Sequence, residues 1–391
     1  MRYQSYFNTA LNIINAYHGE MPLAHFLKQY FAQHKKHGSS DRKMITKACY
    51  AFYRLGKAMC DLNNETRLKV ALFLLWGHEQ EWQIVFQENW LQQEYDTLAK
   101  RWKILQTAFP NLQYNAIFPL QSALSEHIYS TDFSGAFLLQ PKVFLRIRPG
   151  KENEIIAILQ QQKVPYTQLN KTCIALEQGI KIENILPLNK ICVIQDYSSQ
   201  RIGELLQCIP HDSKSLAVWD CCAASGGKSI LVKDTLNAIQ LTVSDIRQSI
   251  LHNLQQRFAV AGIKDYDLFL ADVSKPLTPA LKNRYYDLII ADVPCSGSGT
   301  WSRTPEQLYF FSEQQIEEYA RLQQKIVQQV IPQLKPGGFL LYITCSVFKK
   351  ENEEMVQYIL KNFPLSLMKQ QLMEGYQMQA DTMFAALLQR N

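Results

Sequence analysis

The sequence predicts an α/β protein whose carboxy-terminal half is a doubly wound, Rossmann-like domain. From about residue 210, apolar segments typical of buried strands alternate with amphipathic helical segments, a pattern that gives a parallel sheet covered by helices. Polar residues gather where these strands end, which is where such sheets bind ligands. The predicted strands are Leu216–Cys222, Gln240–Asp245, Tyr266–Val273, Tyr286–Val293 and Gly338–Cys345, with helices such as Arg247–Ala261 and Ser312–Leu334 between them.

Two other regions precede this domain. Residues 5 to about 130 carry apolar residues at three- and four-residue spacing and few prolines, which predicts a helical bundle. A small α/β module is then predicted from the helical segment Glu152–Gln162 and three short β-type runs, Val143–Ile147, Thr172–Leu176 and Ile191–Gln195. Since 391 residues are enough for two or three domains, we expect a helical domain over 1–135, the α/β module over 136–205 and the Rossmann-like domain over 206–391.

The composition excludes several classes of protein. Hydrophobic residues make up 47% and charged residues 19%, as in a globular chain rather than a disordered one. Apolar runs are far shorter than the ~20 residues of a membrane span, and the first residues lack the pattern of a secretory signal. The nine cysteines include no C-x-x-C pair, which argues against a zinc ribbon and a disulfide framework. We therefore expect a protein of the reducing cytoplasm, with no metal, no membrane and no evident obligate protein partner.

The amino-terminal end carries most of the net charge of +6. Up to residue 57 the only acids are Glu20 and Asp41. A local basic surface is the electrostatic footprint of a phosphate-rich partner, although a solvated helical face gives the same pattern. The cations in this segment are Arg2, Lys28, Lys35, Lys36, Arg42, Lys43, Lys47, Arg54 and Lys57.

The loop after the first predicted strand has the small residues of a ligand-binding turn. It reads Asp220-Cys221-Cys222-Ala223-Ala224-Ser225-Gly226-Gly227-Lys228-Ser229. The last four residues, Gly-Gly-Lys-Ser, suggest a loop that binds a nucleotide phosphate, but Cys222 stands where a P-loop needs glycine. The G-x-G-x-x-G motif of dinucleotide-binding domains is also missing. Neither ATP nor NAD is therefore favoured. Small residues still let a ligand approach the backbone, and the start of the next helix favours an anionic group.

Acidic residues end the next two strands. Asp245 closes the second strand, where an acid can accept both hydroxyls of a ribose, as in dinucleotide sites. Asp272 ends the third strand, near where an adenine would lie. Each acid alone is compatible with a cap or a turn. Their recurrence at consecutive strand ends favours a nucleoside-binding edge.

Two cysteines lie at the ends of the fourth and fifth strands. Cys295 follows Asp292-Val293-Pro294, and Cys345 lies within Thr344-Cys345-Ser346. These turns gather over one cleft, where a thiolate near Lys228 or a helix N-terminus is a competent nucleophile. No histidine lies in these motifs, which argues against a Cys–His hydrolase. Five other cysteines are interpreted as small buried hydrophobes: Cys49, Cys60, Cys173, Cys192 and Cys208.

Together these motifs resemble those of the Sun (Fmu, RsmB-type) family of RNA cytosine-5 methyltransferases. Cys222–Ser229 is similar to the family's S-adenosylmethionine loop C-A-A-P-G-G-K-T, Asp292–Thr300 to its D-A-P-C-S-G-T-G motif, and Thr344-Cys345-Ser346 to its T-C-S motif. The resemblance covers about residues 140–391, and its weaker parts are Gln195–Gln200 for the lead-in segment, Arg303 with Pro305-Glu306 for the R-x-P-D stretch, and Gly375…Asp381…Phe384-Ala385 for the closing strands. The departures are Ser225 for proline, Val293 for alanine and Ser298 for threonine. Loss of the proline is expected to loosen the cofactor turn.

The resemblance implies a class I methyltransferase domain that uses S-adenosylmethionine, preceded by an RRM-like α/β module and a NusB-like RNA-binding helical domain. It implies that Cys345 adds to C6 of cytosine, that Cys295 assists release, and that Asp292, with Lys228 nearby, binds the N3/N4 edge of the base. The implied cofactor-binding residues are Cys222, Ala223, Ala224, Ser225, Gly226, Gly227, Lys228, Asp245, Asp272 and Asp292. The expected function is methylation of C5 of a cytosine in RNA, with small-subunit ribosomal RNA favoured as the partner.

Three alternatives have their own expectations. A transfer RNA cytosine-5 methyltransferase would carry the same motifs. In a DNA cytosine-5 methyltransferase the nucleophile would be Cys295, but the T-C-S cysteine and the missing E-N-V-type motif argue against this class. A non-catalytic RNA-binding ribosome assembly factor would be expected to lose Cys345, Cys295 or Asp292, and all three are present.

Overall fold

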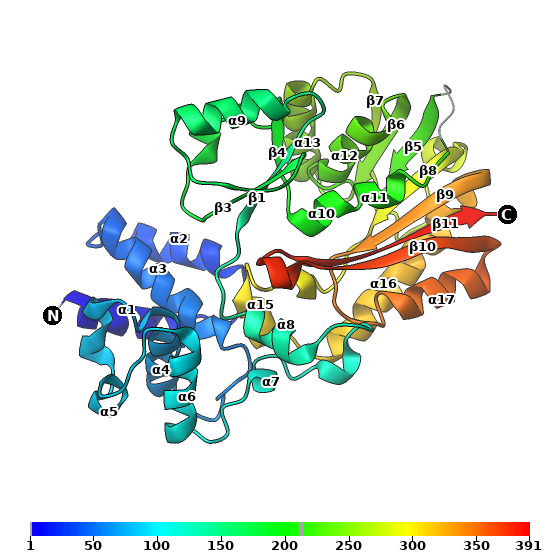
Figure 1. Cartoon of the computed structure of the whole chain (residues 1–391). Helices are drawn as coiled ribbons and strands as arrows, with labels where there is room; N and C mark the ends of the chain where they lie inside the picture. The colour runs from blue at the N-terminus through cyan, green and yellow to red at the C-terminus, as the bar shows by residue number, and fades with distance from the viewer. Residues whose placement is uncertain (1, 211–214) are drawn as a thin grey trace. The chain divides into compact units, whose positions relative to one another are not determined.

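The computed structural model of the chain describes residues 2–210 and 215–391 (Figure 1). The chain divides into two compact units, Met1–Gln140 with Trp301–Ser312, and Pro141–Thr300 with Glu313–Asn391. This division differs from the predicted boundaries in two respects. The segment 301–312, expected in the Rossmann-like domain, belongs to the first unit, and the small α/β module and the Rossmann-like sheet form the second unit together. Within the described residues, no helix is both long and apolar enough to cross a membrane.

The first unit is helical, because its apolar residues recur at helical spacing. In α3 (Ser39–Arg54) the apolar face is buried, with Ile45, Ala48 and Cys49 fully enclosed. The helix that follows, at Asn64–Trp76, is capped by Asn63, whose Oδ1 accepts a hydrogen bond from the Thr66 N–H. The other α-helices are α1 (Arg2–Ala16), α2 (Leu23–Gln33), α4 (Asn64–Trp76), α5 (Glu88–Leu91), α6 (Leu98–Ala108), α7 (Tyr114–Ile117), α8 (Ser130–Ala136) and α15 (Pro305–Phe310), with 3₁₀ turns η1 (Gln80–Val85) and η2 (Gln121–Ala123).

The stretch with Pro305 and Glu306 is part of this first unit. Glu306 is buried, and its Oε1 accepts a hydrogen bond from the Leu23 N–H at 3.2 Å. Leu23 is the first residue of α2, and the residue before it is Pro22, whose side chain has no oxygen with which to cap the helix. Glu306 therefore caps α2 from a segment that follows the Cys295 motif, Asp292–Thr300, by only a few residues.

The small α/β module has a four-stranded antiparallel sheet of order β2-β3-β1-β4. Its core forms where Leu145 and Ile147 of one strand meet Ile155 and Leu159 of the helix. The elements are β1 (Val143–Ile147), α9 (Glu152–Gln161), β2 (Thr167–Asn170), β3 (Cys173–Leu176), η3 (Ile182–Asn184) and β4 (Cys192–Ile194). The sequence did not predict β2, since most of its residues are polar and exposed.

The Rossmann-like part contains a seven-stranded mixed sheet of order β10-β11-β9-β8-β5-β6-β7. The strands from β9 to β7 are parallel, whereas β11 pairs antiparallel with β9, and β10 pairs antiparallel with β11. The strands are β5 (Leu216–Asp220), β6 (Ile239–Asp245), β7 (Tyr266–Leu270), β8 (Tyr286–Asp292), β9 (Leu334–Thr344), β10 (Leu365–Glu374) and β11 (Thr382–Arg390). The helices are α10 (Tyr197–Arg201), α11 (Gly203–Leu206), α12 (Gly227–Leu236), α13 (Gln248–Ala261), α14 (Pro279–Lys282), α16 (Gln314–Val330) and α17 (Glu353–Asn362), with 3₁₀ turns η4 (Ser298–Thr300), η5 (Ile331–Gln333) and η6 (Gly375–Met378).

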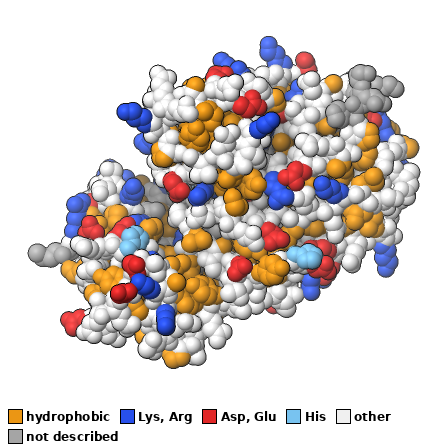
Figure 2. Space-filling model, viewed as in Figure 1, with side chains coloured by type: hydrophobic (Ala, Val, Ile, Leu, Met, Phe, Trp, Pro, Cys, Tyr) orange, Lys and Arg blue, Asp and Glu red, His pale blue; other side chains and the backbone are white. Residues whose placement is uncertain are grey.

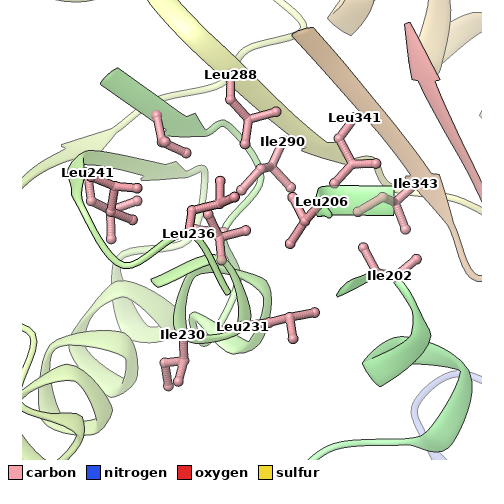
Figure 3. Packing of buried hydrophobic residues seen from close by; sticks show 14 of the residues in the cluster. Ile202, Leu206, Ile230, Leu231, Leu236, Leu241, Leu288, Ile290, Leu341 and Ile343 are labelled. Carbon is pink, nitrogen blue, oxygen red and sulfur yellow. The ribbon is translucent and has the colours of Figure 1, made fainter. Parts of the chain in front are cut away.

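Both faces of the central strands of this sheet are buried, where successive residues point to opposite sides and pack in two separate clusters. Leu288 and Ile290 of β8 pack on the side of α11 and α12, where Figure 3 shows them among Leu206, Leu231 and other aliphatic side chains. The intervening residues of β8 pack on the other side, against α16 and α17. The carboxyl ends of β5, β6, β7, β8 and β9 meet at one edge of the sheet, since these strands are parallel. The predicted site residues follow these ends.

Candidate active site

The loop between β5 and α12 makes a sharp turn at the edge of the sheet. Ala224 and Gly226 both have left-handed backbone conformations, with φ of 45° and 81°. A Cβ on Gly226 would lie 2.5 Å from Cε1 of Phe258, so the turn requires glycine at this position. The Ala223 N–H donates to the Ser244 carbonyl at 2.9 Å, which fastens the loop to β6.

A pocket of about 600 Å³ opens at the carboxyl ends of the parallel strands, a size suited to a small organic cofactor. Seven predicted site residues line it: Cys222, Ala224, Asp245, Asp272, Asp292, Cys295 and Cys345. Ala223, Ser225, Gly226, Gly227 and Lys228 are not among its lining residues. Ala223 is instead packed in the core. Beside Gly227 a Cβ would meet no atom within 4 Å, so the start of α12 is open to a ligand.

The two acids predicted for the cofactor are both held by nearby donors. Asp245 accepts a hydrogen bond from the Ala224 N–H at 3.0 Å through Oδ2, and from the Arg247 N–H at 2.9 Å through Oδ1. It therefore lines the pocket and also fixes the cofactor loop. Asp272 accepts hydrogen bonds from the hydroxyl and the backbone N–H of Ser274, and the hydroxyl contributes most to lowering the Asp272 pKa.

An arginine restrains the loop at the position where the family has proline. Nη1 of Arg257 donates to the carbonyl and to Oγ of Ser225, at 2.9 and 2.7 Å. Its Nε donates to Oδ1 of Asn189 at 3.1 Å. The turn at Ser225 is thus tied to α13 and to the small α/β module, which differs from the loosened turn expected from the sequence.

A chain of polar contacts runs from the small α/β module to Asp292. Nζ of Lys228 lies 3.1 Å from Oδ2 of Asp292 and donates to Oγ of Ser199 at 2.9 Å. Gln195 donates through Nε2 to Oγ of Ser199 at 3.1 Å and accepts from Nε of Arg146 at 2.7 Å. These contacts hold the Lys228 ammonium beside Asp292, although Lys228 itself does not line the pocket.

The two thiols of the strand-end motifs lie next to each other. Sγ of Cys295 and Sγ of Cys345 are 3.3 Å apart, and either can be the donor of the hydrogen bond between them. The Cys345 contact, burial and the negative charge of Glu351 raise the Cys295 pKa well above its ordinary value. One pocket is thus lined by two neighbouring thiols and by one carboxylate, that of Asp292.

Sequence reasoning missed several residues that shape this site. Ser199 and Arg257 position Lys228 and the cofactor loop, and the buried Glu351 contacts the segments next to both cysteines. The lead-in segment around Ser199 gave a signal through its resemblance to the family. Nothing in the pattern around Arg257 or Glu351 marked either residue.

The other cysteines follow the sequence interpretation only in part. Cys49, Cys173 and Cys192 are buried, as expected. Cys60 and Cys208 are exposed, which corrects their interpretation as buried hydrophobes, because both lie in turns that follow helices rather than on an inward helix face. Among residues 2–210 and 215–391, no group of three His, Cys, Asp or Glu side chains is arranged to hold a metal ion.

The basic amino-terminal segment is less uniform than its sequence suggests. Arg54 is buried and donates to the carbonyl of Phe137, while Arg2 is paired with Asp41 and Lys47 with Glu79. Exposed lysines remain within α2, just beyond its end and on α3: Lys28, Lys35, Lys36 and Lys43. On the face seen in Figure 2, Lys and Arg side chains lie among Asp and Glu side chains rather than in one large patch. Any phosphate contact in this segment therefore depends on a few lysines.

Comparison with known proteins places the site in a family. Residues 205–388 match the family described as 16S rRNA methyltransferase RsmB/F. The ribosomal RNA small subunit methyltransferase B of Cronobacter sakazakii is 32% identical over 171 residues, which are 44% of this chain and 38% of that protein. The protein of the same name from Erwinia tasmaniensis is 34% identical over 174 residues, 43% of this chain and 38% of its own length. The match thus spans well under half of these relatives.

Solved structures show the same fold. The crystal structure of PH0851 has a TM-score of 0.71 at 18% identity and covers 98% of both chains. A methyltransferase homologue from Pyrococcus horikoshii has a TM-score of 0.58 at 19% identity and covers 74% of this chain and 98% of its own. The sheet order and these structures show a Rossmann-like fold, and residues 205–388 match a methyltransferase family, which together confirm the predicted class I methyltransferase fold. Residues 205–388 of this domain match the RsmB/F methyltransferase family, and this match confirms the resemblance inferred from the motifs.

The residues present fit S-adenosylmethionine, the cofactor of this methyltransferase family. Asp245 offers acceptor oxygens for ribose hydroxyls. Ile246 and Val273 form an apolar part of the pocket wall, and Asp272 lies beside Val273 in the same wall. The open backbone at Gly227 starts α12, where helix N–H groups favour a carboxylate.

Proposed function

We propose that the chain transfers a methyl group from S-adenosylmethionine to C5 of a cytosine in RNA, through a covalent bond between Cys345 and C6 of the base. The observation that carries this proposal is the contact between Cys295 and Cys345, whose sulfur atoms are 3.3 Å apart in the pocket that also contains Asp292. A single thiol is enough for addition to a base. A second thiol beside it supports a reaction in which the adduct must also be resolved.

The chemistry explains why a thiolate is needed. C5 of cytosine is too electron-poor to react directly with a methyl sulfonium. When Sγ of Cys345 forms a bond to C6, the ring becomes an enamine with high electron density at C5. When bound, S-adenosylmethionine supplies the electrophilic methyl group. The C5 proton is then removed with the assistance of Cys295, the C6–S bond breaks, and Cys345 leaves as a thiolate.

Asp292 and Lys228 have a supporting role in this proposal. The Asp292 carboxylate accepts hydrogen bonds from the N3 and N4 side of cytosine once the adduct is protonated there. The Lys228 ammonium, 3.1 Å from Oδ2, holds that carboxylate toward the pocket. A charge-assisted hydrogen bond such as that between Lys228 and Asp292 is worth roughly 1.5–3 kcal/mol.

The proposed substrate is ribosomal RNA of the small subunit, in the cytoplasm. The names of the relatives from Cronobacter sakazakii and Erwinia tasmaniensis support this substrate. The helical unit with its exposed lysines, which we propose to be a NusB-like RNA-binding domain, supports contact with phosphates. The target cytosine has to be unpaired or extruded, because C5 and C6 are inaccessible to a protein thiol within a stacked helix.

Alanine variants of the two cysteines test the mechanism. Cys345→Ala cannot form the bond to C6, so it should bind RNA and cofactor yet give no methylation and no covalent complex. Cys295→Ala should still attack and methylate, but it should release product slowly and accumulate a protein–RNA species that survives denaturing electrophoresis. A DNA-type assignment predicts the reverse. A denaturation-resistant complex from Cys345→Ala would therefore overturn the proposal.

Thermal melts are the control, because an unfolded protein would mimic the Cys345→Ala result. Neither change should cause a large folding defect, since alanine is nearly as small as cysteine. The substrate is tested separately by bisulfite sequencing of total RNA from a deletion strain. We expect one lost methylation site in small-subunit ribosomal RNA, and loss confined to transfer RNA would contradict this choice.

A further inference from the structure

The two thiols in the pocket are close enough to be joined by a bond. Sγ of Cys295 and Sγ of Cys345 are 3.3 Å apart, so they have to approach each other by about 1.3 Å to reach the length of a disulfide bond. Both cysteines are partly exposed, and both line the pocket of about 600 Å³. A small solute that enters this pocket can therefore reach them.

Backbone hydrogen bonds hold the two cysteine segments together on both sides of the thiols. The Val293 N–H donates to the Ile343 carbonyl at 3.1 Å, just before the cysteines. The Gly299 N–H donates to the carbonyl of Cys345 itself at 2.9 Å. The contact between the thiols is thus a fixed feature of the folded chain, because the segments that carry them are fastened to each other.

A buried side chain adds a further connection next to the thiols. Oε1 of Glu351 lies 2.6 Å from Oγ of Ser296 and 2.5 Å from Oγ of Ser346. Ser296 directly follows Cys295, and Ser346 directly follows Cys345. One carboxyl group therefore holds the neighbours of both cysteines, which are 50 residues apart in the sequence.

The other accessible cysteines lack this arrangement. Cys221 and Cys222 are consecutive, with sulfur atoms 4.0 Å apart, and a disulfide between neighbours in the chain is strained. Cys60 and Cys208 are exposed, and within the described residues neither contacts another sulfur atom. The pair in the pocket is therefore the one that combines access with a partner at the right place.

We propose that Cys295 and Cys345 form a peroxide-sensitive dithiol, an oxidative modification site that hydrogen peroxide converts to a disulfide. The disulfide is inferred from the contact between the thiols alone. Its effect on activity rests on the proposed function, because the new bond removes Cys345 as the nucleophile. In a reducing compartment such a disulfide is transient, as is typical of redox-sensing cysteines.

The oxidation consumes one molecule of hydrogen peroxide and has two steps. An electron pair on one sulfur attacks a peroxide oxygen, the O–O bond breaks, and the hydroxide that leaves takes the thiol proton to form water. The product is a sulfenic acid. The second sulfur then attacks the sulfenic sulfur, the S–O bond breaks, and the departing hydroxide leaves as water with the second thiol proton. The two thiols lose two electrons in total, and the peroxide gains them.

The second thiol also decides whether the modification is reversible. A sulfenic acid without a neighbouring thiol is open to further oxidation, which gives sulfinic and sulfonic acids that reductants do not restore. When the neighbouring thiol captures the sulfenic acid, a dithiol reductant such as dithiothreitol recovers both cysteines by thiol–disulfide exchange. We therefore expect oxidation of the unaltered protein to be reversible.

Oxidation of the free protein tests this inference without RNA or cofactor. The reduced protein is treated with a limiting amount of hydrogen peroxide, the remaining thiols are blocked with iodoacetamide, and an unreduced digest is analysed by mass spectrometry. We expect a linked pair of peptides with Cys295 and Cys345, while Cys60 and Cys208 remain mostly alkylated. Oxidation of these exposed cysteines with no linked pair would overturn the proposal, and this measurement does not depend on any variant folding.

Cys295→Ala removes the second thiol and keeps the first. In this variant Cys345 should stop at the sulfenic acid, which dimedone captures, whereas the unaltered protein should give little dimedone adduct at Cys345. Cys208→Ala is the matched control, because it removes an exposed cysteine outside the pair, and its linked peptides should form as in the unaltered protein. Equal dimedone capture at Cys345 in the unaltered protein and in a folded Cys295→Ala would contradict the proposal.

RNA methylation assays keep the two proposals distinguishable. Methylation should fall in proportion to the linked fraction and recover with dithiothreitol, and full methylation by completely linked protein would contradict the effect on activity. If the reduced protein methylates no RNA while the linked peptides form, the proposed function fails and the dithiol stands. If methylation occurs and no linked peptides form, the dithiol fails and the proposed function stands.

Discussion

Nζ of Lys228 lies 3.1 Å from Oδ2 of Asp292, and the same ammonium donates to Oγ of Ser199 at 2.9 Å. Only 11% of the Lys228 side chain is exposed, against 30% for Asp292. The lysine therefore approaches the acid from the protein side and leaves the pocket side of Asp292 open to a base. The loop resemblance marked Lys228, but only the folded chain explains how it acts at Asp292 without lining the pocket.

Lys228→Met should lower the rate of methylation in a single turnover by about 10- to 100-fold, the range expected for loss of one charge-assisted hydrogen bond. Affinity for S-adenosylmethionine, measured by calorimetry, should change less. Ser199→Ala serves as the control, since it removes one partner of Lys228 but leaves the ion pair, and its rate should fall by less than about tenfold. A Lys228→Met rate close to that of the unaltered protein would remove Lys228 from the proposed site.

The parallel core of the fold was predictable because most of its strands contain largely apolar, buried segments. Tyr286–Asp292 is buried on both faces and needs no partner information to be identified as a strand. The antiparallel strand β11 was foreseen only through the resemblance at Phe384-Ala385, and β10 was not predicted, because its exposed, polar residues carry no burial pattern. Arg257 and Glu351 could not be predicted as site residues, since their roles depend on residues that only the fold brings to them, including Ser225 from 32 positions away and Ser296 from 55.

Asp245→Ala should weaken binding of S-adenosylmethionine by about 10- to 100-fold, because it removes the ribose acceptor and also releases the Ala224 N–H. RNA affinity should hardly change, since the phosphate contacts are expected in the helical unit. Calorimetry with the cofactor and a filter-binding assay with RNA measure the two effects. Unchanged cofactor affinity would refute the role of Asp245.

The exposed lysines near the start of α3 should contribute to RNA binding through phosphates. Replacing Lys35, Lys36 and Lys43 with alanine should weaken binding and make it less sensitive to salt. The slope should fall by about 0.7 for each phosphate of single-stranded RNA that a lysine no longer neutralises. Lys47→Ala is the control, because Lys47 is engaged with Glu79 at 2.5 Å and should contribute little. If the triple variant kept the salt dependence of the unaltered protein, the phosphate-binding surface would lie elsewhere.

Ser225 and Arg257 should be energetically coupled, because one guanidinium nitrogen contacts two atoms of Ser225. Arg257→Ala should weaken cofactor binding by freeing the loop, whereas Ser225→Pro should be tolerated better when Arg257 is absent. A double-mutant cycle on cofactor affinity should give a coupling energy of about 0.5–3 kcal/mol. Ser225→Ala, which keeps the carbonyl contact, should show a smaller effect, and strict additivity of Ser225→Pro and Arg257→Ala would show that the contact does not restrain the loop.

Asp220 should make stability depend on pH in the direction opposite to that of most acids. It is fully buried at the end of β5, its Oδ1 has no hydrogen-bond partner, and burial raises its pKa to about 7. Between its ordinary value of 3.8 and about 7, the folded protein holds a proton there that the unfolded chain has lost. The free energy of unfolding should therefore fall as pH rises through this range, by up to about 1.4 kcal/mol per pH unit relative to Asp220→Asn.

Urea unfolding of the unaltered protein and of Asp220→Asn at pH 5, 6, 7 and 8 measures this difference. The variant should gain stability relative to the unaltered protein from pH 5 to 7, and the gain should level off above the raised pKa, where Asp220 is ionised in both states. Asp272→Asn is the matched control with the opposite sign. The hydroxyl of Ser274 lowers the Asp272 pKa, so its contribution is fully present above the unfolded value and should be constant from pH 5 to 8. A stability difference for Asp220→Asn that is equally flat over this range would show that the Asp220 carboxyl is ionised inside the folded protein.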